Sequence, residues 1–204
     1  ESWRVIVCSK HMENEVRGLF GLPTDKVVRI PNGVYAKKFA VDSVVYEDGL
    51  HKLVQEHEQL IFFVGRLVRE KGVHTLVEAF PMIARNNPAA KVIIAGTGPM
   101  EAQLRHQINC LGLHDRVILA GYVDDRLLKQ LYKRADVAVF PSLYEPFGIV
   151  ALEAMVTNTP VVVADIGGLG ERVEHGRIGL KFYPGNARSL ADQVNGILRD
   201  RGFA

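Results

Sequence analysis

Residues 136–165 read DVAVFPSLYEPFGIVALEAMVTNTPVVVAD, and this stretch predicts a strand, a loop, a helix and a second strand in succession. The strands are expected at 136–141 and 160–165, where short apolar runs rich in β-branched residues are typical of strands covered on both faces. The helix is expected at 149–157, because Gly148 precedes a segment with helical periodicity. This alternation indicates a parallel sheet wrapped by helices.

The same alternation continues along the chain in both directions. Further strands are predicted at residues 60–65, 91–96 and 116–121, and further helices at 73–86, 100–111, 126–134 and 187–199. We expect a kink or a new start at Pro81. N-terminal strands at 4–8 and 26–30 flank a predicted helix at 10–19, and residues 41–58 are expected to form a surface excursion with at most one short helix. About six βα units predict an α/β fold with a doubly wound, Rossmann-like parallel sheet.

Size, composition and charge bound the function. The 204 residues fit one domain, here 1–204, and 48% apolar with 24% charged residues is ordinary for a globular protein. No apolar run approaches the roughly 18 residues of a membrane span, and the first residues do not form a signal peptide, so a cytoplasmic location is expected. A net charge of +2 argues against nucleic acid as partner. Two cysteines and no zinc-type spacing argue against a disulfide framework and a metal site.

Ligands of doubly wound sheets bind beyond the carboxyl ends of the strands, so the turns there are the candidate sites. The turn GTGP at 96–99 does not fit the dinucleotide pattern, because Glu101 stands where the third glycine would fall. A tight turn with Pro99 at the first helical position is the better interpretation. The loop GRLVREKG at 65–72 holds three cations, Arg66, Arg69 and Lys71, which suit a diphosphate; by itself it would more often be a solvated loop.

The loop and helix after residue 141 carry two carboxylates spaced eight residues apart. Glu145 precedes Pro146 and so lies on the loop, whereas Glu153 follows one turn into the helix. The first-turn amides of that helix can bind a phosphate, and carboxylates accept hydrogen bonds from sugar hydroxyls. Taken alone, Glu153 could be a favourable charge near a helix N-terminus and Glu145 a surface residue. Because both loops are expected at one edge of the sheet, the two together favour a nucleotide-sugar site.

At this point the sequence resembles the retaining glycosyltransferases of the GT-B architecture, within glycosyltransferase family four, and specifically their C-terminal donor-binding half. The matching features occur in order over nearly the whole chain: PNGV at 31–34, GRLVREKG at 65–72, GTGP at 96–99, EPFGIVALE at 145–153, TPVV at 159–162 and the GGL turn at 167–169 with Glu171. The motifs are most similar to those of glucosyltransferases that build α-glucan, such as glycogen synthase, although mannosyl or other hexosyl transfer stays open. Tyr35 departs from the Asp usual after the PNG turn, and Asn158 replaces a usual Gly but tolerates the left-handed helix cap.

The resemblance implies roles for individual residues. Arg66 and Lys71 match the pair that neutralises the donor diphosphate, and Glu145 matches the residue that hydrogen-bonds the donor sugar and acts electrostatically. These three are the candidate catalytic residues. The candidate substrate-binding residues are Glu153 for the ribose, the backbone around Phe147, Gly148, Ile149 and Val150 for sugar and phosphate, Val123 for the base, and Gly65.

The resemblance also implies an activity. The chain is expected to be part of a retaining hexosyltransferase that uses a UDP-, ADP- or GDP-hexose, needs no cofactor or metal, and acts on an acceptor sugar or glycan. The N-terminal acceptor-binding domain is expected to be absent from this chain, and the chain alone is expected to be inactive. The alternatives are a nucleotide-binding or interaction module without transferase activity, and a relative of the sugar-nucleotide epimerases.

Overall fold

The computed structural model describes residues 3–39 and 48–200. Its main feature is a six-stranded sheet in which every pairing is parallel, in the order β5-β4-β3-β6-β7-β8. The strands are β3 (Gln59–Val64), β4 (Ala90–Ala95), β5 (Val117–Gly121), β6 (Val137–Phe140), β7 (Val161–Ala164) and β8 (Leu180–Phe182). The chain starts the sheet in its middle with β3, adds β4 and β5 on one side, and then adds the other three on the other side. The predicted doubly wound α/β sheet is therefore confirmed.

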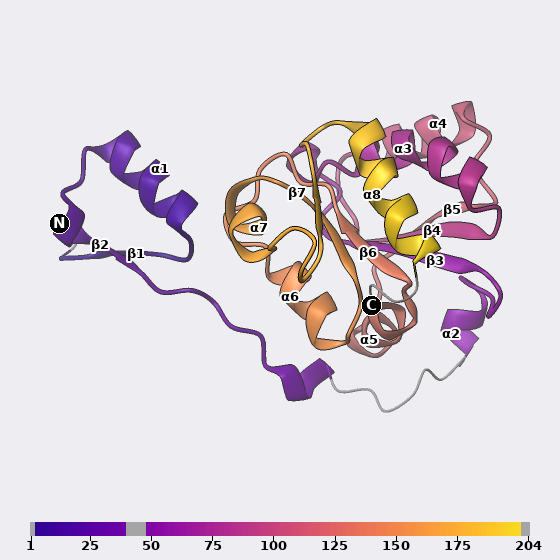
Figure 1. The fold of residues 1–204 in the computed structure, drawn as a ribbon, viewed down its shortest axis with the longest axis horizontal. Coiled ribbons are helices and arrows are strands. Elements are labelled where there is room, and N and C mark those ends of the chain that lie inside the picture. The colour runs from indigo at the N-terminus through magenta and orange to yellow at the C-terminus, as the bar shows by residue number, and fades with distance from the viewer. Residues whose placement is uncertain (1–2, 40–47, 201–204) are drawn as a thin grey trace.

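Helices cover both faces of this sheet (Figure 1). One face packs against α3 (Val73–Asn86), α4 (Glu101–Cys110) and α8 (Ala187–Arg199), and the other against α2 (Asp48–His51), α5 (Asp125–Arg134), α6 (Ile149–Val156) and α7 (Gly167–Arg172). Successive residues of β3 alternate between the two cores: Ile61 and Phe63 face α3, whereas Leu60 and Phe62 face α5. This is why the run LIFFV is apolar at every position.

The sheet order places β3 next to β6 and makes this pair the switch point of the fold. The chain leaves β3 toward β4 through α3 on one face, and it leaves β6 toward β7 through α6 on the other face. The two loops that follow these strands, residues 65–72 and 141–148, therefore diverge from one point. In open parallel sheets the ligand crevice lies at such a point.

The N-terminal residues form a unit of their own. The strands β1 (Val5–Val7) and β2 (Val27–Arg29) pair in parallel with each other in a separate two-stranded sheet, with α1 (Lys10–Phe20) between them. They do not extend the main sheet as the count of about six βα units assumed. The unit packs against helix α7 instead of against an edge strand of the main sheet (Figure 1). There the side chain of Glu171 accepts hydrogen bonds from the backbone N–H groups of Lys10 and His11.

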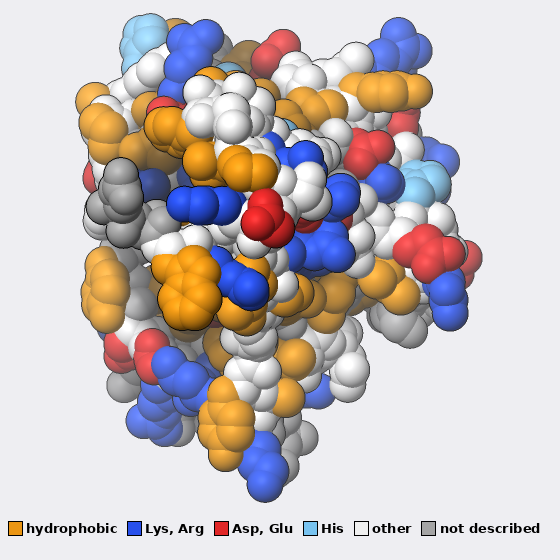
Figure 2. Space-filling model, turned by 90° about the vertical axis from the view of Figure 1, so that its left-hand side faces the viewer, with side chains coloured by type: hydrophobic (Ala, Val, Ile, Leu, Met, Phe, Trp, Pro, Cys, Tyr) orange, Lys and Arg blue, Asp and Glu red, His pale blue; other side chains and the backbone are white. Residues whose placement is uncertain are grey.

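The surface of this N-terminal unit is partly apolar. No residue of α1 is buried, and Trp3 and Phe20 are 86% and 71% exposed. Figure 2 views the molecule from this side, where apolar side chains lie between lysines and arginines.

Several elements differ in detail from the sequence-based expectations. Helix α3 runs unbroken through Pro81, because its buried residues hold it against the sheet and α8. Helix α4 begins at Glu101 rather than at Pro99. The short elements α7 and β8 were not predicted: α7 is rich in glycine and β8 has only three residues.

Two further comparisons concern chain segments next to the core. The segment 41–58 is less of a surface excursion than expected, because Leu50 and Val54 are buried; residues 41–47 lie outside the described residues. The expected left-handed cap after α6 is confirmed at Asn158, with φ 58°.

Within the described ranges, no helix has the length and apolar character that crossing a membrane requires.

Candidate functional site

The loops after β3 and β6 are bonded to each other. The backbone N–H groups of Leu143 and Tyr144 donate to the carbonyl oxygen of Glu70, at 2.7 and 3.2 Å. Gly72, with φ 64°, lies so close to the second loop that a Cβ at this position would be 1.8 Å from the carbonyl oxygen of Pro141. Only glycine fits both the backbone conformation and the contact. The basic loop is therefore fixed against the loop that carries Glu145.

Glu145 is the centre of this contact. Glu145 is only 7% exposed. Its Oε2 accepts hydrogen bonds from Nζ of Lys71 at 2.7 Å and from the hydroxyl of Ser142 at 3.3 Å. Its Oε1 accepts from the backbone N–H of Gly148 at 3.2 Å. A buried carboxylate is stable only when it is paired and hydrogen-bonded, and Glu145 is both. The expected convergence of the basic and acidic loops is thus observed for Lys71 and Glu145.

The cations of the basic loop lie beside this carboxylate. Arg66 and Lys71 line a pocket of about 350 Å³ together with Val68, Glu70, Tyr144 and Pro146, and the last two flank Glu145 in the sequence. The third cation, Arg69, is not part of this lining. Its charge acts instead on His74, whose pKa is lowered by burial first and by Arg69 second. Two cations and the acidic loop therefore share one pocket, which suits an anionic ligand.

Helix α6 begins directly after this loop. Its cap residue Gly148 has φ 85°, and a Cβ there would be 2.6 Å from the side chain of Leu169. Phe147 is buried beneath the guanidinium of Arg172, 3.6 Å from the ring centroid. Ile149 is 39% exposed at the start of the helix. The N–H of Gly148 is occupied by Glu145, so this amide differs from the expectation that it would face a ligand.

Glu153 lies just past the middle of α6, and its surroundings differ from those of Glu145. It is half-buried, and its Oε2 accepts from the hydroxyl of Tyr132 in α5 at 3.0 Å. Burial raises the pKa of Glu153, while the Tyr132 hydrogen bond and the charge of Lys38 lower it and Asp125 raises it. Lys38 and Asp125 form an ion pair of 2.8 Å. Glu153 is therefore an ionisable group whose charged form is disfavoured by burial, and its polar neighbours come from two segments, α5 and residues 36–39.

The remaining predicted site residues lie after β3, after β5 and in the first turn of α6. Gly65 directly follows β3, and its N–H donates to the carbonyl oxygen of Ala95 at 3.0 Å. Val123 follows β5, and its side chain packs against the core on the α5 and α6 side. Val150 packs against the same core, and its carbonyl oxygen accepts from the Tyr132 hydroxyl at 3.4 Å.

Sequence reasoning missed three residues that contact the predicted ones: Tyr132, Ser142 and Arg172. Ser142 lies three residues before Glu145, so its position on the same loop was a signal that could have been used. Tyr132 and Arg172 gave no signal, because their contacts arise only when α5 and α7 pack beside α6 and its loop.

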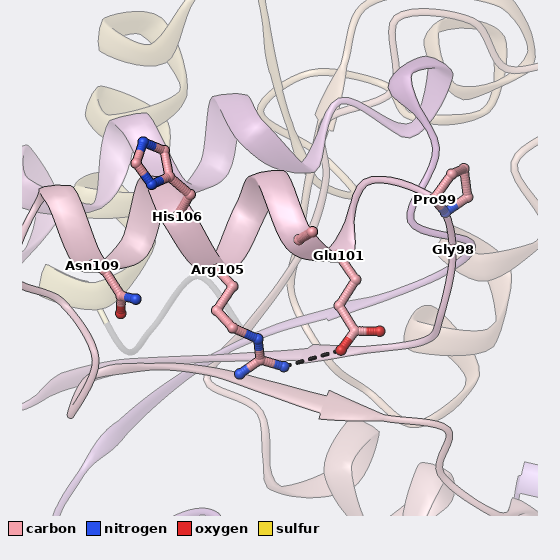
Figure 3. Close-up of a pocket in the computed structure, with 7 residues that line it drawn as sticks. Gly98, Pro99, Glu101, Arg105, His106 and Asn109 are labelled. Atoms are coloured by element: carbon pink, nitrogen blue, oxygen red, sulfur yellow. Dashed lines mark hydrogen bonds and ion pairs between the residues drawn. The ribbon is translucent and has the colours of Figure 1, made fainter.

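The turn 96–99 supports the site rather than forming one. The backbone of Leu67, within the basic loop, donates to Thr97 at 2.8 Å and accepts from Met100 at 2.9 Å. A larger hollow of about 590 Å³ lies on the other side of this turn, along α4 (Figure 3), where Arg105 pairs with Glu101 at 3.0 Å. None of the predicted site residues lines it. In the described ranges no group of three or more His, Cys, Asp or Glu side chains could hold a metal ion.

Comparison with known proteins identifies the family of the chain. Residues 51–204 match the family described as glycosyl transferases group 1. Over its whole length the chain is 44% identical to an uncharacterised glycosyltransferase of Methanocaldococcus jannaschii and 37% identical to a glycogen synthase of Mycobacterium tuberculosis. It covers 53% and 49% of those two proteins, so the chain spans about half the length of the curated relatives it matches.

Solved structures match equally well. The Anabaena protein HepE, in complex with UDP and glucose, superposes with a TM-score of 0.85 at 29% identity, over 99% of this chain and 55% of that one. Sucrose-phosphate synthase from Thermosynechococcus elongatus also gives 0.85, at 33% identity, over 100% of this chain and 51% of that one. The chain therefore belongs to the glycosyl transferases group 1 family, and its fold is that of a GT-B glycosyltransferase C-terminal domain.

Proposed function

We propose that the chain is the donor-binding domain of a retaining hexosyltransferase, which transfers a sugar from a nucleoside-diphosphate sugar to an acceptor held by an N-terminal domain outside this chain. One observation carries the proposal. At the switch point of the sheet, Arg66 and Lys71 line a pocket beside the buried carboxylate of Glu145. Cations next to a carboxylate suit a ligand that joins a diphosphate to a sugar.

The chemistry assigned to these groups follows from where charge develops. When the bond between the anomeric carbon and the diphosphate breaks, negative charge grows on the leaving phosphate, and Arg66 and Lys71 stabilise it. Glu145 accepts hydrogen bonds from the sugar, and Glu153 accepts them from the ribose. Glu145 is held by Lys71, Ser142 and Gly148. This supports a positioning and electrostatic role rather than a nucleophilic one, as retention by front-face attack requires.

The donor and acceptor are proposed from the relatives. We infer a UDP- or ADP-glucose donor and an α-glucan acceptor, because a glycogen synthase is 37% identical over the whole chain and the HepE structure contains UDP and glucose. A cytoplasmic location is part of this proposal, and the two free cysteines, Cys8 and Cys110, are in keeping with it.

Calorimetry tests the binding half of the proposal. UDP, ADP, GDP and their glucose conjugates are titrated into the chain, and we expect saturable binding of at least one nucleotide. Inorganic pyrophosphate provides the control for charge alone. If none of the three nucleotides binds even at millimolar concentration, the proposed function is wrong.

A transfer assay tests the catalytic half. The chain preceded by its N-terminal domain is incubated with the donor that binds best and with α-glucan, and the configuration of the product is read by NMR. We expect an α-linked product from an α-linked donor. Binding without transfer to any glucan would instead favour a nucleotide-binding module.

A further inference from the structure

The hydroxyl of Tyr132 lies beneath the nucleoside end of the proposed site. The ring is fully buried and makes edge-to-face contacts with Phe62 and Phe39, at centroid distances of 5.2 and 6.2 Å. The hydroxyl crosses from α5 to α6, where its two possible acceptors are the Oε2 of Glu153 at 3.0 Å and the carbonyl oxygen of Val150 at 3.4 Å.

The Tyr132 hydroxyl donates its hydrogen bond to the Glu153 carboxylate rather than to the carbonyl oxygen. A phenol has one proton to donate, and a charged acceptor at the shorter distance makes the stronger bond. Burial, and then the charge of Glu153, raise the pKa of Tyr132 well above its usual range, so the hydroxyl keeps its proton at neutral pH. Glu153 therefore has one Oε2 lone pair engaged from inside the protein.

Packing alone does not require this hydroxyl. A phenylalanine would fill the same space between Phe62 and Phe39 without placing a polar atom in the core, which costs free energy unless it is hydrogen-bonded. The partner that satisfies the hydroxyl is a half-buried carboxylate whose own burial is unfavourable. Burial is unfavourable for both the hydroxyl and the carboxylate, and each is the hydrogen-bond partner of the other. At a proposed ligand site, such a pair is better explained by function than by stability.

We propose that Tyr132 is a positioning residue that holds the Glu153 carboxylate in the orientation in which it accepts hydrogen bonds from the ribose hydroxyls of the donor. The inference rests on the proposed function, and it adds to it a residue that touches no ligand atom. The hydrogen bond from Tyr132 restricts rotation of the carboxylate, so its other lone pairs are aimed before the ligand arrives. The phosphate end of the site, at Lys71 and Glu145, does not depend on this bond.

The test is the substitution Tyr132→Phe, which keeps the ring and removes the donor. By calorimetry we expect UDP, or ADP or GDP if one of them binds the native chain more tightly, to bind about tenfold more weakly. Inorganic pyrophosphate has no ribose, so its affinity should stay within a factor of two (~0.4 kcal/mol). Tyr183→Phe is the matched control, because this tyrosine is 75% exposed. Equal weakening of nucleotide and pyrophosphate, or no weakening of either, would overturn the proposal.

A pH profile separates positioning from a loss of packing. The groups that act on Glu153 are Tyr132 and Asp125 from α5 and Lys38 from the segment 36–39. Removal of the Tyr132 hydrogen bond leaves the carboxylate easier to protonate, so the acid midpoint of nucleotide binding should move to higher pH in Tyr132→Phe. Titration of the nucleotide phosphate is common to both proteins and cancels in the comparison. An unchanged midpoint contradicts the proposal.

The double variant completes the test. If Tyr132 acts through Glu153, adding Tyr132→Phe to Glu153→Ala should cost no further nucleotide affinity, because the alanine variant has no side-chain acceptor for the hydroxyl to position. If the two losses add instead, Tyr132 acts by another route and the proposal is wrong. If the native chain binds no nucleotide at all, it is the proposed function that fails.

Discussion

The two glutamates of the site are satisfied in opposite ways. Glu145 is buried with a cation, a hydroxyl and a backbone N–H around it, and these come from loops that follow two different strands. Glu153 is half-buried, accepts from a neutral phenol, and has a pKa raised chiefly by burial. The Glu145 carboxylate thus joins the two loops of the fold, whereas burial of the Glu153 carboxylate lowers the stability of the folded state. The four predictions that follow separate these two ends of the site.

The largest effect is expected where the two loops meet. Gly72→Ala should lower the free energy of unfolding by about 3–5 kcal/mol, because the added Cβ meets the backbone of Pro141. Gly112 is a matched control: its φ is also 64°, but nothing lies within 4 Å of its added Cβ. Gly112→Ala should therefore cost only about 1–2 kcal/mol. Denaturant unfolding of both variants measures the difference, and equal losses would show that the loop contact contributes nothing.

Lys71→Ala should have the next largest effect. It leaves the buried Glu145 carboxylate without its cation, so we expect a loss of about 1–3 kcal/mol in stability as well as at least tenfold weaker nucleotide binding. The exposed Lys52 supplies the control variant Lys52→Ala. Thermal unfolding and calorimetry measure the two effects, and an unchanged affinity for both nucleotide and pyrophosphate would remove Lys71 from the proposed site.

Glu145→Gln should separate sugar from phosphate. Lys71 serves both Glu145 and, in the proposal, the diphosphate, so loss of the carboxylate charge releases it. We expect UDP affinity to be kept or increased, while UDP-glucose loses about threefold to tenfold relative to UDP. The exposed Glu56 gives the control Glu56→Gln. Calorimetry with both ligands provides the ratio, and parallel losses for UDP and UDP-glucose would contradict the assigned role.

Glu153→Gln should have the smallest effect on stability and the opposite sign. Because the folded state raises the pKa of Glu153, the folded protein binds more protons than the unfolded one, and stability falls as pH rises from the ordinary value through the raised one. Glutamine removes this cost, so the melting temperature near neutral pH should rise by about 1–2 °C, with no difference below about pH 4. Nucleotide affinity should nevertheless fall. A lower melting temperature near neutral pH would show that Glu153 stabilises the fold.

The sequence predicted most of the main sheet because β3, β4, β6 and β7 are apolar at nearly every position, which is what burial on both faces demands. It did not reveal that β1 and β2 form a separate sheet, because a strand pattern does not name its partner. The length of β8 and the glycines of α7 left those elements without a local signal.

For the site, the sequence by itself determined which chemical groups follow which strands: the cations after β3, Glu145 after β6 and Glu153 in the helix behind it. Only the tertiary structure decided their partners. The 2.7 Å contact of Lys71 with Glu145 and the 3.0 Å contact of Tyr132 with Glu153 join residues 74 and 21 positions apart. Local patterns reflect the preferences of neighbouring residues, whereas such contacts depend on how strands are ordered in the sheet and how helices pack against it.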